Sequence, residues 1–296
     1  MKTRTLALLF SILLITSCSK NSETPQAPAS PDIILDGLQT EACLEKGLDS
    51  EIEAMTWNLE RFPRKGRPTV TEVSKMMTYM DMDLIAIQEI KSTRDFEDLV
   101  ASLPEHKGVY GWNQYIRLGF IYDSRDLEMI GRPSEIFVDN PREFPRSPLV
   151  VTFRHLKLDI TFTAINIHLK CCDNVPRRAD AMKMLKDYLD TNYAGKNLVV
   201  LGDFNQHLKN NRDNTNMYFP FMDEITYDVT TLDVISNPDD WSYPSGKWKS
   251  HLDQIIVSNE FVTTNRQTKT LAIDVCDENY LTEISDHRPV FVRITK

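Results

Sequence analysis

The sequence predicts an α/β chain folded as a four-layer sandwich, in which two β-sheets packed face to face lie between layers of helix. Short runs rich in β-branched residues occur along the chain together with amphipathic stretches of helical spacing. Strands that alternate with helices indicate sheets covered by helices. The length of 296 residues and the apolar content of 41% are enough for one large domain with a substantial core.

Runs of apolar and β-branched residues predict the strands. In chain order they cover residues 51–58, 83–89, 119–123, 149–155, 159–168, 197–203, 253–258 and 290–294. Helices are predicted over residues 70–80, 92–103 and 179–193. The second of these starts at a serine, has acidic residues in its first turns and is stopped by a proline. The Met and Leu stripe of the third predicts core packing.

The N-terminus has the features of a bacterial signal peptide over residues 1–17. Basic residues precede an apolar stretch over residues 6–15, which is too short for a stable transmembrane helix. Residues 15–18 (ITSC) match a lipobox, which predicts cleavage before Cys18 and attachment of lipid to its sulfur. A plain secretory signal or a buried apolar helix is the alternative. The lipoprotein interpretation places the chain in the bacterial cell envelope, lipid-anchored to a membrane and extracytoplasmic.

Residues 18–50 connect this signal to a single domain that we expect over residues 51–296. Residues 19–31 are rich in Ser, Pro and Ala and fit a flexible tether for the lipidated cysteine. Residues 32–50 form a short extension to which the sequence assigns no structure.

The net charge of −9 excludes a protein that coats nucleic acid generally, because such binding needs Lys and Arg to neutralise phosphates. Loss of residues 1–17 removes Lys2 and Arg4 and makes the chain more acidic. A local basic rim could still hold an anionic substrate.

Four cysteines lie outside the signal, namely Cys43, Cys171, Cys172 and Cys276. An even number in an oxidising compartment predicts structural disulfides. The sequence leaves all three pairings open, including a vicinal bridge between the two adjacent cysteines. A metal site is the weaker alternative, since no CxxC spacing is present.

Polar residues stand at the ends of several predicted strands and are expected to gather at one edge of the sheet pair. Metal-assisted hydrolysis of a phosphodiester needs an activated water, neutralisation of the phosphate oxygens and help for the leaving alkoxide. Asn58, Glu89 and Asp286 offer the oxygen ligands that Mg²⁺ or Mn²⁺ prefers. Taken singly, these residues are more often a turn residue, a helix cap and a loop turn.

The remaining strand-end residues predict acid–base chemistry. His287 can act as a general base if Asp253 fixes its tautomer. His168 can donate a proton to the leaving group or a hydrogen bond to the phosphate, although a lone histidine at a strand end is usually structural. Asp203 and Asn205 follow a glycine turn, where short polar side chains often only cap.

Six motifs occur in the order WNLE, IQE, NIHL, GDFN, LDQI and SDHRPV between residues 51 and 295. Together they resemble the deoxyribonuclease I-like endonuclease/exonuclease/phosphatase superfamily. The resemblance implies the four-layer sandwich and a Mg²⁺-dependent phosphoesterase. It also implies metal-site roles for Asn58, Glu89 and Asp286, orientation of the water and stabilisation of the transition state by Asp203 and Asn205, and catalytic roles for His168 and for His287 with Asp253.

The resemblance also extends to Arg146, which precedes a strand as a phosphate-contacting arginine does in several members. A surface ion pair is the alternative. Two departures stand out. Related nucleases carry an acidic residue near the third strand that supports the first histidine, but residues 113–115 (NQY) offer no carboxylate, which weakens His168 as an acid. The adjacent Cys171 and Cys172 are also foreign to the general pattern.

Two segments are expected to select the substrate. Residues 61–67 (RFPRKGR) place basic side chains, including Arg64 and Lys65, directly after the first metal motif. Residues 241–251 interleave aromatic residues with lysines, a pattern that can stack bases and grip phosphates. The aromatic residues are Trp241, Tyr243 and Trp248. A solvated loop with one aromatic packed inward is the alternative.

We therefore expect a monomeric, divalent-metal-dependent phosphodiesterase, foremost an endonuclease that cuts DNA outside the cytoplasm. The acidic charge argues against DNA. A phosphatase for phospholipid or inositol phosphate head groups is the first alternative, against which stands the lack of an exposed apolar hairpin. A catalytically silent ligand-binding lipoprotein is the second, against which stands the full set of catalytic residue types.

Overall fold

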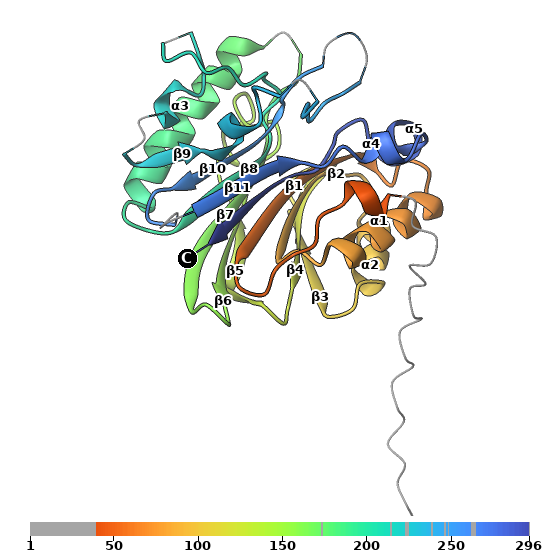
Figure 1. The fold of residues 1–296 in the computed structure, drawn as a ribbon. Helices are drawn as coiled ribbons and strands as arrows, with labels where there is room; N and C mark the ends of the chain where they lie inside the picture. The colour runs from red at the N-terminus through yellow and green to blue at the C-terminus, as the bar shows by residue number, and fades with distance from the viewer. Residues whose placement is uncertain are drawn as a thin grey trace, which may run out of the picture. The chain divides into compact units, whose positions relative to one another are not determined.

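Two six-stranded sheets stack face to face between helices, which confirms the predicted fold class (Figure 1). The computed structural model describes residues 40–172, 174–213, 215–222, 225–237, 239–245, 247, 249–261 and 265–295. The predicted signal, Cys18 and the tether lie outside these residues, as does Trp248. Within them, no helix has the length and apolar character needed to cross a membrane.

The first sheet has the strand order β11-β12-β1-β2-β4-β3. Its strands are β1 (Ile52–Phe62), β2 (Leu84–Ile90), β3 (His106–Tyr110), β4 (Arg117–Asp123), β11 (Asn265–Thr270) and β12 (Val290–Thr295). β1 and β2 run parallel, with Asn58 opposite Gln88. Because parallel strands need a crossover, α1 (Arg67–Met80) connects them. The carboxyl ends of both strands therefore lie at the same edge of the sheet.

The second sheet has the strand order β5-β6-β7-β8-β10-β9. Its strands are β5 (Leu127–Glu135), β6 (Leu149–His155), β7 (Ile160–His168), β8 (Leu198–Asp203), β9 (Tyr227–Val229) and β10 (Asp253–Ser258). β7 and β8 run parallel and are joined by α3 (Val175–Asn192). The register places His168 opposite Asp203, and Asp203 opposite Asp253 on the antiparallel β10. Three polar residues from neighbouring strands thus stand side by side at one end of the sheet.

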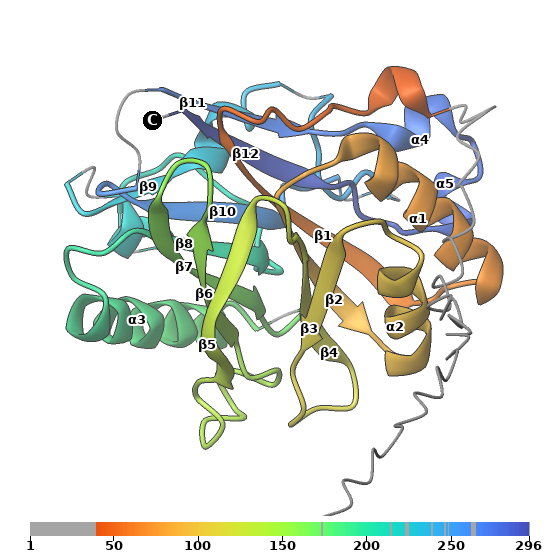
Figure 2. The same ribbon diagram turned by 90° about the horizontal axis from the view of Figure 1, so that it is seen from below.

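Helices cover the outer faces of both sheets. Figure 2 shows α1 and α2 beside the first sheet and α3 beside the second. The other helical elements are α2 (Thr93–Ala101), α4 (Ile273–Cys276), α5 (Tyr280–Glu283) and the 3-10 turns η1 (Glu41–Cys43), η2 (Phe219–Phe221) and η3 (Thr230–Asp233). Three apolar cores follow, one under α1 and α2, one between the sheets and one under α3. The layers are those that the sequence predicts.

The predicted helices are found, with shifted starts. α1 begins at Arg67 and α3 at Val175, because each has a proline in its first turn, where the missing N–H costs nothing. The α2 helix begins after Ser92, whose Oγ accepts a hydrogen bond from the Asp95 N–H at 3.3 Å.

Four strands were not predicted, and they are the four edge strands β3, β5, β9 and β11. An edge strand has a partner on one side only and tolerates polar side chains, glycine and proline, so its sequence signal is weak. β11 reads NRQTKT, and β5 contains both glycine and proline.

One disulfide joins Cys43 in η1 to Cys276 in α4, with 6.2 Å between the Cα atoms. The structure therefore forms one bridge of the three possible pairings and leaves the other two cysteines of that pairing without a disulfide. The Sγ atoms of Cys171 and Cys172 lie 2.9 Å apart as thiols.

Candidate active site

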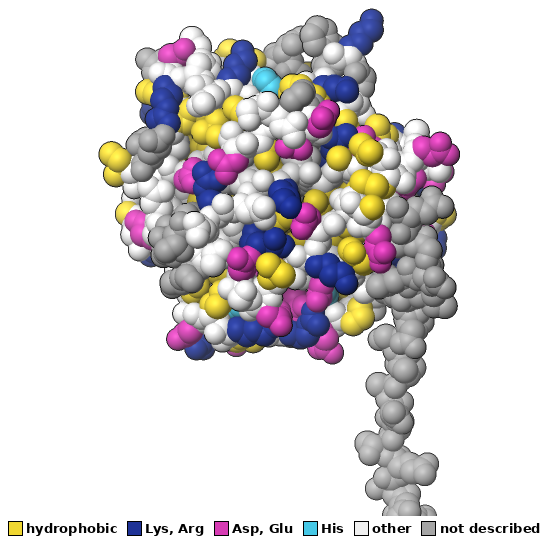
Figure 3. All heavy atoms as spheres, viewed as in Figure 1, with side chains coloured by type: hydrophobic (Ala, Val, Ile, Leu, Met, Phe, Trp, Pro, Cys, Tyr) yellow, Lys and Arg dark blue, Asp and Glu magenta, His cyan; other side chains and the backbone are white. Residues whose placement is uncertain are grey.

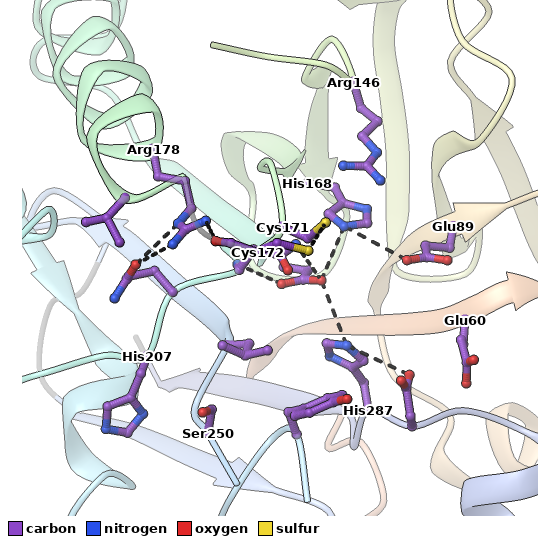
Figure 4. A pocket seen from close by; sticks show the side chains of 17 residues that line it. Glu60, Glu89, Arg146, His168, Cys171, Cys172, Arg178, His207, Ser250 and His287 are labelled. Carbon is purple, nitrogen blue, oxygen red and sulfur yellow. Dashed lines mark hydrogen bonds and ion pairs between the residues drawn. The ribbon is translucent and has the colours of Figure 1, made fainter. Parts of the chain in front are cut away.

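The strand ends of both sheets surround one pocket of about 800 Å³ (Figure 4). Its polar lining includes Glu60, Glu89, Arg146, His168, Arg178, Asp203, Asn205, Gln206, His207, Tyr243, Asp286 and His287. Of the residues predicted to act in catalysis or metal binding, only Asn58 and Asp253 are absent from this lining. Asn58 bonds Asp203, and Asp253 bonds His287. The structure therefore brings the whole predicted catalytic set together.

Asp203 is the centre of this arrangement. Its Oδ2 accepts a hydrogen bond from Asn58 Nδ2 at 3.0 Å and lies 3.3 Å from His168 Nε2 and 3.9 Å from His287 Nε2. Its Oδ1 accepts the backbone N–H of Asn205 at 2.8 Å. Burial raises the pKa of Asp203 to about 7, against the opposing effect of His287.

Gly202 makes this position possible. Its φ is +153°, and a Cβ atom there would lie 1.9 Å from the Ile167 carbonyl oxygen. No other residue fits so close to the neighbouring strand. Asn205, with φ of +52°, then turns back so that its Nδ2 donates to Leu169 O and to Asp203 Oδ2, both at 3.1 Å.

His287 and Asp253 form a buried pair. The Nδ1 of His287 lies 2.8 Å from Asp253 Oδ2, which fixes the ring so that Nε2 faces Asp203. Burial lowers the pKa of His287, but the carboxylates of Asp253 and Asp203 outweigh it and raise that pKa to about 10. The pair therefore stabilises the protonated imidazole, which is what a general base needs after it has taken a proton.

A second layer of hydrogen bonds holds the loop that carries His287. Ser285 Oγ donates to the Asn58 carbonyl at 2.5 Å and accepts the His287 N–H at 3.0 Å. Tyr280 OH donates to the His287 carbonyl at 2.6 Å and accepts from Trp57 Nε1 at 2.9 Å. These contacts attach the loop before β12 to the end of β1.

His168 is buried, and its surroundings favour the neutral imidazole. Burial, Arg146 and His287 together hold the pKa of His168 well below its usual range. Its Nδ1 is buried and has no hydrogen-bond partner among the described residues. Among the described residues, no carboxylate therefore bonds this nitrogen.

Carboxylates gather at one end of the pocket. Glu89 Oε2 accepts the Arg61 N–H at 3.0 Å, and Glu89 Oε1 lies 4.0 Å from His168 Nε2. Asp286 Oδ1 is buried and has no hydrogen-bond partner among the described residues. Glu60, which sequence reasoning missed, lines the same end, and burial followed by the Asp286 carboxylate raises its pKa.

These carboxylates fit a divalent cation, because neighbouring acidic groups are stabilised by positive charge, and the imidazole of His287, 3.9 Å from Asp286 Oδ1, is the only cationic group that contacts this oxygen among the described residues. Asn58 donates to Glu89 Oε1 at 3.5 Å, and its Oδ1 faces the Glu60 N–H at 3.0 Å. Ligand atoms of Asp203, Asp253 and His287 also lie within 4.8 Å of one another. The Asp253 contact already occupies His287 Nδ1, so we assign that group to acid–base chemistry rather than to the metal.

The residues predicted to bind substrate are only partly at the pocket. Arg146 lines it and donates from Nη1 to Leu169 O at 3.2 Å. Tyr243 lines it too, with its ring centroid 5.0 Å from that of His287. Trp241 instead packs on His251 at 4.6 Å between ring centroids. Arg64 and Lys65 are absent from the pocket lining, although Arg64 forms an ion pair with the pocket residue Glu60.

Sequence reasoning also missed Arg178, Gln206 and His207 in the pocket wall. Gln206 and His207 directly follow GDFN, so their position after a pocket motif was a usable signal. Arg178 lies inside a helix and carries no such signal.

The model of the Endonuclease/Exonuclease/phosphatase family matches residues 55–287. A protein named deoxyribonuclease from Thioalkalivibrio sp. (strain K90mix) is 24% identical over 175 residues, which are 53% of this chain and 46% of that protein. The chain thus spans about half the length of the curated relative that it matches.

Solved structures share the fold. TDP2 of D. rerio, complexed with a single strand DNA product, has a TM-score of 0.67 at 11% identity and covers 82% of this chain and 98% of its own. The human Nocturnin catalytic domain with bound sulfate has a TM-score of 0.61 at 17% identity, over 82% and 93%. A mannosyl-6-phosphatase of Bacteroides thetaiotaomicron has a TM-score of 0.59 at 14% identity, over 81% and 98%.

Proposed function

Because the chain belongs to the endonuclease/exonuclease/phosphatase family and hence to the metal-dependent phosphoric ester hydrolases, we propose that it is an endonuclease that hydrolyses DNA outside the cytoplasm. The observation that carries the hydrolytic part is the position of Asp203 Oδ2, within 4 Å of Asn58, His168 and His287. The deoxyribonuclease relative supports DNA as the substrate.

Asn58, Glu89 and Asp286, together with Glu60, would hold the divalent cation, for which we propose Mg²⁺, with Mn²⁺ as a substitute. When bound, such a cation would neutralise phosphate oxygens, stabilise the leaving alkoxide and lower the pKa of His287 through its charge. Asn58 would then lie at the junction of the metal end and Asp203.

Each catalytic residue would have a separate role. Asp203 and Asn205 orient the attacking water, and His287 takes its proton on Nε2 while Asp253 stabilises the imidazolium. His168, neutral and beside Arg146, donates a hydrogen bond to the phosphate rather than a full proton. Arg146 adds a positive charge to the same phosphate oxygens.

Nicking of supercoiled plasmid tests this proposal. The purified protein with Mg²⁺ should convert supercoiled plasmid to open circles, and both EDTA and His287→Asn should abolish nicking. His106→Asn is the matched control, since His106 lies in β3 and is absent from the pocket lining. Intact plasmid with the unmodified protein would remove the DNA proposal and direct the search to lipid and inositol phosphoesters.

The location is a separate proposal that rests on residues 15–18. Lipid attached to Cys18 would hold the enzyme at the bacterial cell envelope. Cys18→Ser should no longer incorporate labelled fatty acid or fractionate with membranes. Unchanged labelling of that variant would exclude the anchor.

The face seen in Figure 3 carries Lys and Arg side chains interspersed with Asp and Glu rather than one basic field. On this face a polyanion would meet only local basic groups. We therefore expect the contacts of the pocket itself to decide the affinity for the substrate.

A further inference from the structure

Arg178 lies in the wall of the catalytic pocket, and the residue as a whole is only 4% exposed. Its Nη1 donates to the carbonyls of Lys170 and Cys172, each at 2.8 Å, and its Nη2 donates to Gln206 Oε1 at 2.7 Å. All three acceptors are neutral oxygens.

No carboxylate forms an ion pair with Arg178 among the residues that the structure describes. Buried arginines are normally paired with acidic groups. Arg288, the other arginine buried to this degree in the described chain, follows the rule and bonds both oxygens of Asp274, at 2.5 and 2.9 Å. Burial accordingly lowers the pKa of Arg178, although an arginine remains charged at any ordinary pH.

The charge of Arg178, which has no direct carboxylate partner among the described residues and is acted on by Asp203 only at longer range, lies at a distinct end of the pocket. In the view of Figure 4, Arg178 and Glu60 stand on opposite sides, with His168 and His287 between them. The carboxylates of the metal end are therefore separated from Arg178 by the catalytic residues. Val175, at the N-terminus of the 18-residue helix α3, lines the pocket as well, and the positive end of the helix dipole adds to the field there.

The size of the pocket points in the same direction. A volume of about 800 Å³ is far more than one phosphate group fills and lies in the upper part of the range of ligand pockets, roughly 300 to 1,000 Å³. The space beyond the catalytic residues is therefore available to a neighbouring part of the substrate.

We propose that Arg178 forms a second anion subsite, which binds the phosphate next to the one that is hydrolysed, so that the substrate class is a polynucleotide strand rather than a compound with a single phosphoester. This inference rests on the proposed function and makes it more specific. Gln206 supports the subsite, because its Oε1 is held by Arg178 and its amide nitrogen is left as a donor for the same anion.

A purely structural role for Arg178 makes a different prediction. In that case the arginine only clamps the turn at residues 170–172, and its loss would slow the hydrolysis of every substrate to the same degree. A subsite instead affects substrates that carry a second phosphate more than substrates that do not. The ratio of the two activities separates the two roles.

The test compares kcat/KM on a single-stranded decanucleotide with kcat/KM on bis(p-nitrophenyl) phosphate, a diester with no second phosphate. For Arg178→Gln we expect the ratio of decanucleotide to small-ester activity to fall about tenfold, mainly through KM. The dependence of log KM on log salt should also become shallower, by about 0.7 for one lost phosphate contact on a single strand.

Arg177→Gln is the matched control, because this neighbouring arginine is partly exposed and bonds the carbonyls of Pro141 and Arg142 instead. Its activity ratio should stay within twofold of the wild type. Arg178→Lys keeps the charge, and we expect it to retain the salt slope while it loses part of the ratio. If Arg178→Gln fails to fold, the lysine variant decides.

Three results would overturn the inference. The first is that Arg178→Gln lowers kcat/KM by the same factor on both substrates. The second is that it lowers kcat/KM on neither. The third is a wild-type enzyme that hydrolyses the small ester or a phosphoinositide but not the decanucleotide, which would remove the polynucleotide substrate while leaving the hydrolase intact. A wild type that hydrolyses no phosphoester with Mg²⁺ or Mn²⁺ would instead overturn the hydrolytic part of the proposed function.

Discussion

Replacement of Asp253 by Asn isolates the charge that acts on His287. Asp253 is buried and its Oδ2 lies 2.8 Å from His287 Nδ1, so Asn keeps the shape and removes the negative charge. The pKa of His287 is raised from 6.5 to about 10 although burial lowers it, so the carboxylates supply the whole rise. This rise corresponds to about 5 kcal/mol between the two protonation states.

We expect Asp253→Asn to lower the pKa of His287 by about 1 to 3 units, since the carboxylate of Asp203 remains. The value of kcat should fall about 10² to 10⁴-fold, because the imidazolium loses its partner and the tautomer is no longer fixed. An NMR titration of His287 in EDTA reads the first effect, and hydrolysis of bis(p-nitrophenyl) phosphate with Mg²⁺ reads the second.

The same change alters stability in a defined pH window. Since the folded-state pKa of His287 is raised, its protonation stabilises the fold fully below pH 6.5, and this contribution is lost as the pH rises towards 10. The stability advantage of the wild type over Asp253→Asn, measured without divalent cations, should therefore shrink across that window. Asp98→Asn, an exposed member of an ion pair with Arg67, is the control and should change neither quantity. An unchanged His287 pKa together with full activity in Asp253→Asn would refute the assigned pair.

Three further changes test the fold that holds the site. Cys43→Ser with Cys276→Ser opens a loop that spans 233 positions and should lower the free energy of unfolding in denaturant by about 2 to 5 kcal/mol. Cys171→Ser breaks no bridge and should lower it little. Equal stability of the two variants would contradict the pairing. Gly202→Ala should cost about 3 kcal/mol or more and lower kcat, because its Cβ would meet the Ile167 carbonyl at 1.9 Å, and a variant of normal stability would show that β8 can shift. Glu53 is buried, and burial followed by Asp83 raises its pKa to about 7, so its ionisation destabilises the fold as pH rises from about 4.5 to 7. The stability of Glu53→Gln should therefore increase relative to that of the wild type over this range. A relative decrease would mean that the ion pair with Arg293 outweighs burial.

The central strands and their terminal residues could be predicted from sequence for a physical reason. β1, β2, β7, β8 and β10 are buried on both faces or nearly so, and their β-branched runs are therefore strong signals. The polar residue that ends each run is conspicuous because it interrupts an apolar pattern. Asn58, Glu89, His168 and Asp203 each end such a run.

The pocket wall beyond these strand ends could not be predicted in the same way. Glu60 itself has a positive φ of 37°, and no local pattern indicates that its carboxylate turns towards Asp286. Arg178 sits in a helix that carries many other charged residues, and only its burial and its tertiary contacts, such as the one with Gln206, distinguish it from Arg177. The edge strands escaped prediction because polar side chains suit an edge as well as they suit a loop.

The register of the second sheet gives the catalytic site an unusual dependence on folding. His168, Asp203 and Asp253 are far apart in the chain and become neighbours only when β7, β8 and β10 pair in their native alignment. A slip by one residue would turn each side chain to the opposite face of the sheet. Activity regained during refolding would therefore report only the molecules in which these long-range pairings are complete. The long connection between Asp203 and Asp253 can vary in sequence and alter substrate preference without moving either carboxylate.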